Sequence, residues 1–234
     1  MRIAVNHVTR MALPRVCVAG IALETFEHVR PTTPPSDTLT RELLREEGGP
    51  FGMGAIVELG PTAPCPSPPE VEDRRFRPAS ARRIEDMHSE EFLSLLERIS
   101  APDLESAFGP ALERVGWRYA VEAGHGDRSL AVIETSGRPI LAVDEQFGKL
   151  QLRLDDVEPP CYIPVTDIRF YGDDQKTIKT SAVENVRVRL RRGVDVFLML
   201  GLARAYKASG DDRERHWLQV NGLCLVDRPV ADVP

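Results

Sequence analysis

The residues best suited to bind a ligand alternate along the stretch GKLQLRL, residues 148–154. If its leucines point into a core, Lys149, Gln151 and Arg153 point to the opposite side, because successive side chains of a strand alternate between its faces. The same alternation in CYIPVTD places Tyr162 outward. Cations beside an aromatic ring can hold a phosphate while a base stacks on the ring. The pattern therefore indicates a surface suited to single-stranded DNA or RNA.

Three further residues complete this candidate surface: Arg169, Tyr206 and Lys207. Arg169 follows the stretch CYIPVTDI, while Tyr206 and Lys207 lie in AYKASGDDRER, between two long predicted strands. A second interpretation stays open, in which the tyrosines cover apolar surface and the cations only keep the chain soluble. Acids in the same loop, Asp211 and Asp212 among them, favour this second interpretation.

Signatures of catalysis are missing from the sequence. It contains no G-x-S-x-G, no P-loop, no H-E-x-x-H and no G-x-G-x-x-G. The four cysteines are far apart, with no C-x-x-C pair, and the five histidines are equally dispersed. Metal sites need clustered ligands. We therefore expect a protein that is not an enzyme and that uses neither a metal nor another cofactor.

The composition is that of an ordinary globular chain, with 42% hydrophobic and 28% charged residues. No apolar run approaches the ~18 residues of a transmembrane helix, and the opening MRIAVNHVTR is too polar for a signal peptide. We expect a cytoplasmic protein with no membrane partner. The net charge of −6 argues against strong non-specific binding to duplex DNA.

The stretch ENVRVRLRRG, residues 184–193, fits either a basic strand or an amphipathic helix. Val183, Val186 and Leu190 fall on one helical stripe. Ser181 and Glu184 have the spacing of a capping box, and Gly193 is a natural helix end. The pattern therefore predicts a helix over residues 181–192.

The N-terminal part begins with three predicted strands, IAVNHV, RVCVAGIAL and EHVRP. A helix is predicted for DTLTRELLREEGG, with Asp37 or Thr38 as its cap and Gly48 as its end. GAIVELG then resumes the strand pattern.

The middle of the chain is rich in proline, arginine and helical pattern. Five prolines fall within residues 60–70, which predicts a stiff connector. Five arginines surround Phe76 in RRFRPASARR; they could stack on bases, but a solvated linker balanced by downstream acids is the preferred interpretation. SEEFLSLLERIS, capped by Ser89, predicts a helix, and DLESAFGPALERVG a helical stretch broken at Pro110.

Residues 129–226 read strand, strand, strand, helix, strand, strand, which is the element order of an OB-fold. The N-terminal part repeats the first five of these elements, although no closing strand is evident in its sequence. We therefore predict a mainly β (α+β) protein with two OB-like five-stranded barrels joined by a helical and Pro-rich middle. The predicted units are 1–75, a connector at 76–124, and 125–234.

The stretches CVAGIALE, HVRP, YIPVTDIRF, LMLGLAR and HWLQVNGL resemble the bacterial dual OB-containing domain family. The resemblance implies two OB barrels and a nucleic-acid-binding role in mobile-element or phage-defence settings. It supplies no catalytic residue. Two hypotheses follow: a single-strand-binding accessory to a nuclease, helicase or other effector, or an adaptor whose barrels dock a partner protein.

Overall fold

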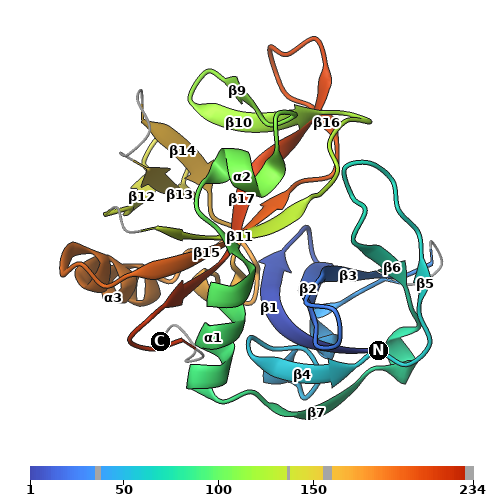
Figure 1. Ribbon diagram of the computed structural model, residues 1–234. Helices are drawn as coiled ribbons and strands as arrows, with labels where there is room; N and C mark the ends of the chain where they lie inside the picture. Colours follow the sequence, from blue (N-terminus) through green and yellow to red (C-terminus); the bar gives the residue numbers. More distant parts are fainter. Residues whose placement is uncertain (35–37, 136–137, 155–159, 230–234) are drawn as a thin grey trace.

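The computed structural model describes residues 1–34, 38–135, 138–154 and 160–229 (Figure 1). Strands dominate the chain and group into three sheets, which confirms the mainly β class. No helix in this described part is both long and apolar enough to cross a membrane.

The N-terminal unit is one sheet of seven strands with the spatial order β5-β6-β3-β2-β1-β4-β7. The strands are β1 Arg2–Arg10, β2 Val16–Ala22, β3 His28–Thr32, β4 Ala55–Glu58, β5 Ala63–Pro64, β6 Asp73–Arg75 and β7 Arg82–Asp86. β1, β2, β3 and β4 match the four predicted strands. The Pro-rich segment is not a bare connector, because it contributes β5, which pairs with β6.

Two strands that the sequence did not reveal follow β4 and pair with opposite sides of the sheet. β6 runs parallel to β3, and β7 runs antiparallel to β4. A 3-10 turn over Pro78–Ser80 separates them, and the Ser80 hydroxyl donates to the Leu59 carbonyl at 2.7 Å. The proline interrupts the strand pattern, so neither strand is long enough to be seen in the sequence.

The helix predicted over DTLTRELLREEGG is wrong. The described part of the segment forms two 3-10 turns, Arg41–Leu43 and Arg45–Glu47, and Asp37 lies outside the described residues. Long-range bonds engage its backbone: the Val16 N–H donates to Leu39 O, and Phe51 exchanges backbone bonds with both Leu43 and Arg45. These contacts replace the i→i−4 ladder of an α-helix. Gly48 does end the segment, in the left-handed conformation.

The arginine-rich segment is folded into the N-terminal unit. Phe76 is buried and packs edge-on against Phe51, with ring centroids 6.2 Å apart. The ring is therefore a core side chain and is not available to bases. This contradicts the alternative interpretation, in which the arginines around Phe76 form a base-stacking surface. Arg82 pairs with Glu58, and Arg83 with Asp86.

The C-terminal unit is built from two sheets. The larger has the order β8-β11-β15-β17-β10-β9, with β16 paired to β17, and the smaller has the order β12-β13-β14. The strands of the larger sheet are β8 Ser100–Ala101, β9 Glu113–Val115, β10 Arg118–Glu122, β11 Leu130–Thr135, β15 Val196–Leu202, β16 Tyr206–Lys207 and β17 Glu214–Leu225. Those of the smaller are β12 Ile140–Asp144, β13 Lys149–Leu154 and β14 Cys161–Pro164.

The two sheets meet around one core. A parallel bridge joins Val165, just beyond β14, to Val220 on β17. At the other side, β11 leads along the chain into β12, which the sequence did not predict as a strand. Inward side chains of both sheets share one apolar cluster that includes Leu152, Ile163 and Leu198.

The stretch that fits two patterns in the sequence is a helix, α3 Thr180–Arg191, with Val183, Val186 and Leu190 buried against the C-terminal unit. The capping argument for it was wrong, because Lys179 occupies the cap position and no side chain caps the helix. Glu184 does not take part in a cap; its carboxylate pairs with Arg187 and Arg191, which lie further along the same helix.

The connecting segment 76–124 contains two helices as well as strands of both units. α1 Ser89–Ile99 begins at Ser89, with His88 at the cap position and no side-chain cap, so the predicted Ser89 cap is wrong. α2 Leu104–Phe108 is short, and Asp103 caps it through the Ser106 N–H at 2.7 Å. The rest of the predicted second helical stretch contains β9, the first strand of the β9–β10 hairpin.

α1 lies between the two units (Figure 1). Its Leu95 packs on Ala4 and Ile21, which face outward from β1 and β2. On another side, Phe92 and Leu96 pack with Met53 of the N-terminal unit and with Met199 of β15. The outer face of the first sheet is therefore covered at β1 and β2.

A buried polar network also joins the units. Glu72 accepts bonds from the Ser129 N–H and hydroxyl, both at 2.7 Å, and from the Leu130 N–H at 3.0 Å. Asp73 pairs with Arg30 at 2.6 Å and with Arg204 at 2.6 Å. Buried carboxylates need such partners to offset their loss of hydration, so residues 70–73 act as a polar clamp between the units.

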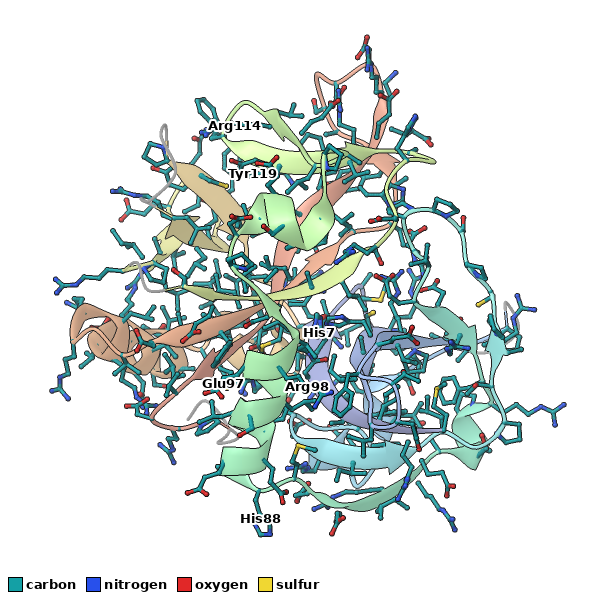
Figure 2. All side chains as sticks on the ribbon, in the orientation of Figure 1. His7, His88, Glu97, Arg98, Arg114 and Tyr119 are labelled. Atoms are coloured by element: carbon teal, nitrogen blue, oxygen red, sulfur yellow. The ribbon has the colours of Figure 1, made fainter. Side chains whose placement is uncertain are left out.

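Two histidines lie close together on the covered side: His7 on β1, which is buried and labelled in Figure 2, and the half-buried His28 on β3, with ring centroids 6.0 Å apart. Burial, with a further effect of Arg128, lowers the pKa of His28 to about 4. Burial also holds the pKa of His7 well below its ordinary value, with smaller effects of His28 and Arg30. Both rings are therefore neutral near pH 7.

Candidate functional site

The outer face of the small sheet is open, in contrast to that of the N-terminal unit. Along β13 the leucines are buried, while Lys149 is exposed and Gln151 and Arg153 are half-buried. The predicted alternation on this strand is therefore what the structure shows. Tyr162 on β14 is exposed on the same face.

The register of the three strands arranges these side chains in rows. Arg153 lies opposite Ile140 on β12 and opposite Tyr162 on β14. Ile140 is 43% exposed and Tyr162 is 36% exposed, so both are accessible beside the arginine. Opposite residues on antiparallel strands have Cβ atoms roughly 5 Å apart. This row brings a cation, an aromatic ring and an apolar side chain within reach of one ligand.

The next two rows are more polar. Gln151 lies opposite Ala142 and Pro164, and its Nε2 donates to Asp144 Oδ2 at 3.1 Å. Lys149 lies opposite Asp144 itself. The carboxylate of Asp144 therefore reduces the positive potential at this end of the face, which limits how strongly it can attract phosphate.

The turn between β12 and β13 adds an aromatic side chain that the sequence reading did not single out. Asp144 Oδ1 accepts the backbone N–H groups of Gln146 and Phe147, at 3.0 and 3.2 Å, which fixes the turn. Phe147 is 63% exposed, and the Lys149 Nζ lies 5.9 Å from its ring centroid. An exposed ring beside a cation is the arrangement that single-strand binding uses.

A second unforeseen aromatic comes from the β9–β10 hairpin. Trp117 is 71% exposed at its tip, and its carbonyl accepts the Tyr162 N–H at 3.0 Å. The sequence signal was readable: Gly116-Trp117 is a two-residue connection with φ 64° at the glycine, and Val115 pairs with Arg118 on either side. The helical interpretation of DLESAFGPALERVG concealed it.

The hairpin is held by Arg114, whose guanidinium donates to Gly116 O at 2.9 Å and to Pro160 O at 3.1 Å. The same guanidinium lies 5.8 Å from the Tyr119 ring centroid, on the hairpin labelled in Figure 2. Because Pro160 directly precedes β14, these bonds fix the hairpin beside the open face.

Tyr206 and Lys207 form the short strand β16 on the other side of the same hairpin. Tyr206 is 43% exposed and lies 6.3 Å from the Trp217 ring. Arg118 stacks on Trp217 at 4.1 Å and reaches the Tyr206 hydroxyl at 3.5 Å. The hairpin therefore contacts β14 through Trp117 and β16 through Arg118. It connects the two groups of predicted site residues.

The other cations of the β15–β17 connection are neutralised. Arg213 pairs with Glu122 at 3.0 Å, and Arg215 pairs with Asp211 at 2.9 Å and with Glu113 at 3.3 Å. The bond from the Arg213 backbone N–H, with a further contribution from Arg215, holds the pKa of Asp211 below its ordinary value. Lys207 itself lies opposite Glu214. This loop therefore adds aromatic surface more than net positive charge.

Arg169 does not join the face. It lies in the 3-10 turn Ile168–Phe170 and is buried, with its guanidinium bonded to both oxygens of Asp167 and to Leu223 O at 2.6 Å. Asp167 is fully buried and also accepts the Leu223 N–H. Removing one partner of a buried ion pair of this kind lowers the free energy of unfolding by several kcal/mol, because it leaves the other charge buried and unpaired. Arg169 is thus a structural residue that fixes the start of the turn to β17.

No group of three or more His, Cys, Asp or Glu side chains suited to a metal ion exists among the residues that the structure describes. The face offers cations, the amide of Gln151 and aromatic rings, groups that can bind and orient a ligand.

Comparison with protein families matches residues 2–223 to the dual OB-containing domain. No curated protein and no solved structure matches the chain.

Proposed function

Since the chain belongs to the dual OB-containing domain family, we propose that it binds single-stranded DNA or RNA on the open face of β12, β13 and β14, as an accessory to a nuclease, helicase or defence-type effector. We place this activity in the bacterial cytoplasm and assign it no catalytic step.

Strand pairing supports an OB barrel in the C-terminal unit. β11 and β12 act as the two halves of a first strand: one pairs with β15 and the other with β13. The order then continues through β14, across the Val165–Val220 bridge to β17, and back to β15. A five-stranded Greek-key barrel with its helix before the fourth strand has this order. In such barrels the outer face of the second and third strands, here β13 and β14, is where oligonucleotides bind.

The observation that carries the proposal is the row Ile140, Arg153 and Tyr162, continued by Trp117 beyond β14. Aromatic side chains stack on bases of any identity, at about 1–3 kcal/mol per base. With Phe147 at one end and Tyr206 at the other, exposed rings follow the face along its length. This arrangement supports recognition with little sequence preference.

Charge sets the expected strength. The chain carries −6 overall, and Asp144 and Asp211 are carboxylates beside the proposed path. Non-specific binding by proteins with a strong basic field reaches Kd values of about 10⁻⁴–10⁻⁶ M. We therefore expect micromolar or weaker affinity, most of it from stacking.

The test is fluorescence anisotropy of a labelled oligothymidine over a series of salt concentrations. If Lys149 and Arg153 contact phosphates, replacing both with Ala should reduce the slope of log K against log salt by about 0.7 per lost contact. The matched control replaces Lys176 and Arg192, two exposed cations away from the face, with Ala. That control should leave the slope unchanged.

Tyr162→Ala should weaken binding by about 1–3 kcal/mol with little change in slope, because stacking releases few counterions. Tyr162→Phe keeps the ring and should restore most of the affinity. If no oligonucleotide changes anisotropy even at low salt, the proposal is wrong, and the adaptor function, which the net negative charge favours, takes its place.

A further inference from the structure

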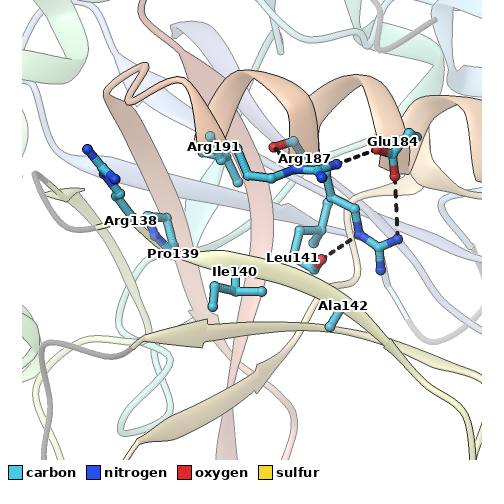
Figure 3. Close-up of a pocket in the computed structure, with 9 residues that line it drawn as sticks. Arg138, Pro139, Ile140, Leu141, Ala142, Glu184, Arg187 and Arg191 are labelled. Carbon is cyan, nitrogen blue, oxygen red and sulfur yellow. Dashed lines mark hydrogen bonds and ion pairs between the residues drawn. The ribbon is translucent and has the colours of Figure 1, made fainter.

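A groove of about 610 Å³ lies between β12 and α3, beside the edge of the small sheet (Figure 3). Its floor is apolar, formed by Pro139, Ile140 and Ala142 of the β12 side with Leu190 of the helix. Its rim carries Arg138, Arg187 and Arg191. The groove borders the open face, because Ile140 and Ala142 also stand in the rows of Arg153 and Gln151, but its arginines come from outside those rows.

The charge of the groove is opposite to that of the whole chain. Three arginines and one glutamate line it, which leaves 3 − 1 = +2, whereas the chain carries −6. An apolar floor with cations along its rim fits a segment that alternates apolar and acidic side chains.

The arginines are already arranged for carboxylates. The Arg187 Nε donates to the Leu141 carbonyl at 2.7 Å, which fixes that guanidinium over the strand edge. Glu184 pairs with Arg187 at 3.6 Å and also with Arg191, as the dashed lines in Figure 3 show. One carboxylate of the protein's own chain therefore occupies the position that a ligand carboxylate would take.

The strand side of the groove favours an extended ligand. β12 is the last strand on its side of the three-stranded sheet. Backbone groups at a sheet edge can bind a further strand, while pockets for alternate side chains give specificity.

We propose that this groove binds an extended acidic peptide of a partner protein, with apolar side chains on the floor and carboxylates at Arg138 and Arg191. The proposal does not rest on nucleic-acid binding by the open face. A protein that bound oligonucleotides and no peptide, or the reverse, would separate the two.

The probe is a short fluorescein-labelled peptide in which Glu alternates with Val, titrated with the full chain and followed by anisotropy. A peptide with Lys in place of Glu serves as the control ligand. Arg138→Glu combined with Arg191→Glu should weaken binding of the acidic peptide about tenfold or more, because two attractive contacts become repulsive. Arg192→Glu reverses a single charge at the residue next to Arg191, outside the groove. This variant should leave the affinity for the acidic peptide within about twofold.

Glu184→Gln should change the affinity for the acidic peptide in the opposite direction to the arginine substitutions. Removing the internal carboxylate should tighten peptide binding about threefold, since the arginines lose their competing partner. Melting temperatures of all variants would show that each is folded.

Three results would overturn the proposal. The Lys peptide could bind as well as the Glu peptide, Arg192→Glu could weaken binding as much as the double change, or Glu184→Gln could leave the affinity unchanged. A fourth outcome, in which the double change removes oligonucleotide binding and no peptide binds, would assign the groove to nucleic acid instead.

Discussion

The second strands of the two units have similar places in their sheets but different surroundings. β2 is flanked by β1 and β3, and β13 by β12 and β14. Along β2 six of seven residues are buried, whereas along β13 buried and accessible residues alternate. The outward side chain Ile21 is covered by Leu95 of α1, while the outward Arg153 lies on an open face.

The difference in cover follows from the residue types of the two strands. VCVAGIA is apolar on both sides, as a strand covered on both faces must be, and KLQLRL alternates, as a strand with one face in water does. Two units of one chain therefore need not leave the same face open. In this chain the N-terminal unit uses its outer face for internal packing, and the C-terminal unit keeps its face accessible.

The largest expected effect comes from placing one charge on each face. Ile21→Asp should lower the free energy of unfolding by about 3–5 kcal/mol, because the carboxylate is buried against α1 without a partner. Gln151→Asp, on the equivalent strand of the open face, should change it by less than about 1 kcal/mol. Urea denaturation measures both. Equal losses would show that the two faces are equally covered.

The second-largest loss of stability is expected from a change in the polar clamp, residues 70–73. Glu72→Ala removes an acceptor of three hydrogen bonds and leaves the Ser129 and Leu130 donors buried, so unfolding should cost about 2–3 kcal/mol less. If the clamp joins the units, tryptophan fluorescence, which reports only the C-terminal unit, should no longer coincide with far-ultraviolet circular dichroism. Coincident transitions with unchanged stability would contradict that role.

The buried His7 and the half-buried His28 predict a pH dependence confined to the covered side. The folded-state pKa of His28, about 4, lies below the unfolded value of ~6.5, so the unfolded state binds more protons as pH falls. The contribution of His28 to stability is therefore fully present above pH ~6.5 and is lost as pH falls toward 4. Between pH 7 and pH 5 the free energy of unfolding should fall by about 2 kcal/mol through His28. His7 should add to the decline. His28→Gln should make the denaturation free energy less dependent on pH, and an unchanged dependence would count against the assignment.

The smallest effect concerns the open face alone. Trp117→Ala should weaken oligonucleotide binding by about 1–2 kcal/mol without changing stability, because the ring is exposed and only its backbone carbonyl holds β14. Anisotropy at one salt concentration, together with a thermal melt, is sufficient to test this. A drop in melting temperature without a change in affinity would give Trp117 a structural role.

Local periodicity predicted the elements whose partners lie close in sequence or whose pattern is strong. α3 followed from Val183, Val186 and Leu190, and the outward residues of β13 from strict alternation. The 3-10 turns near Leu44 could not be predicted, because donors from Val16 and Phe51 decide that backbone. Tertiary contacts overrode helical propensity there.

The positions of the candidate site residues were predicted in part for a similar reason. Alternation correctly placed Lys149 and Tyr162 on the outward face, but it says nothing about residues outside strands. Arg169 lies in a turn where a buried carboxylate, Asp167, takes up its charge, and no sequence pattern distinguishes that arginine from an exposed one. Trp117 reaches the face only because the connecting segment folds back as a hairpin beside β14.

The cover on β1 and β2 has a consequence for the order in which the chain is synthesised. β17, whose Cys224 belongs to the cluster that packs beside α1, ends about 200 residues after β2. At ribosomal rates of about 5–20 residues per second, α1, which covers Ile21, leaves the ribosome roughly 4–15 s after β2, and β17, which completes the packing around α1, roughly 10–40 s after β2. During that interval the first sheet presents an apolar surface to the cell. Nascent chains of this protein are therefore expected to bind chaperones through β1 and β2, and to release them once β17 has been added.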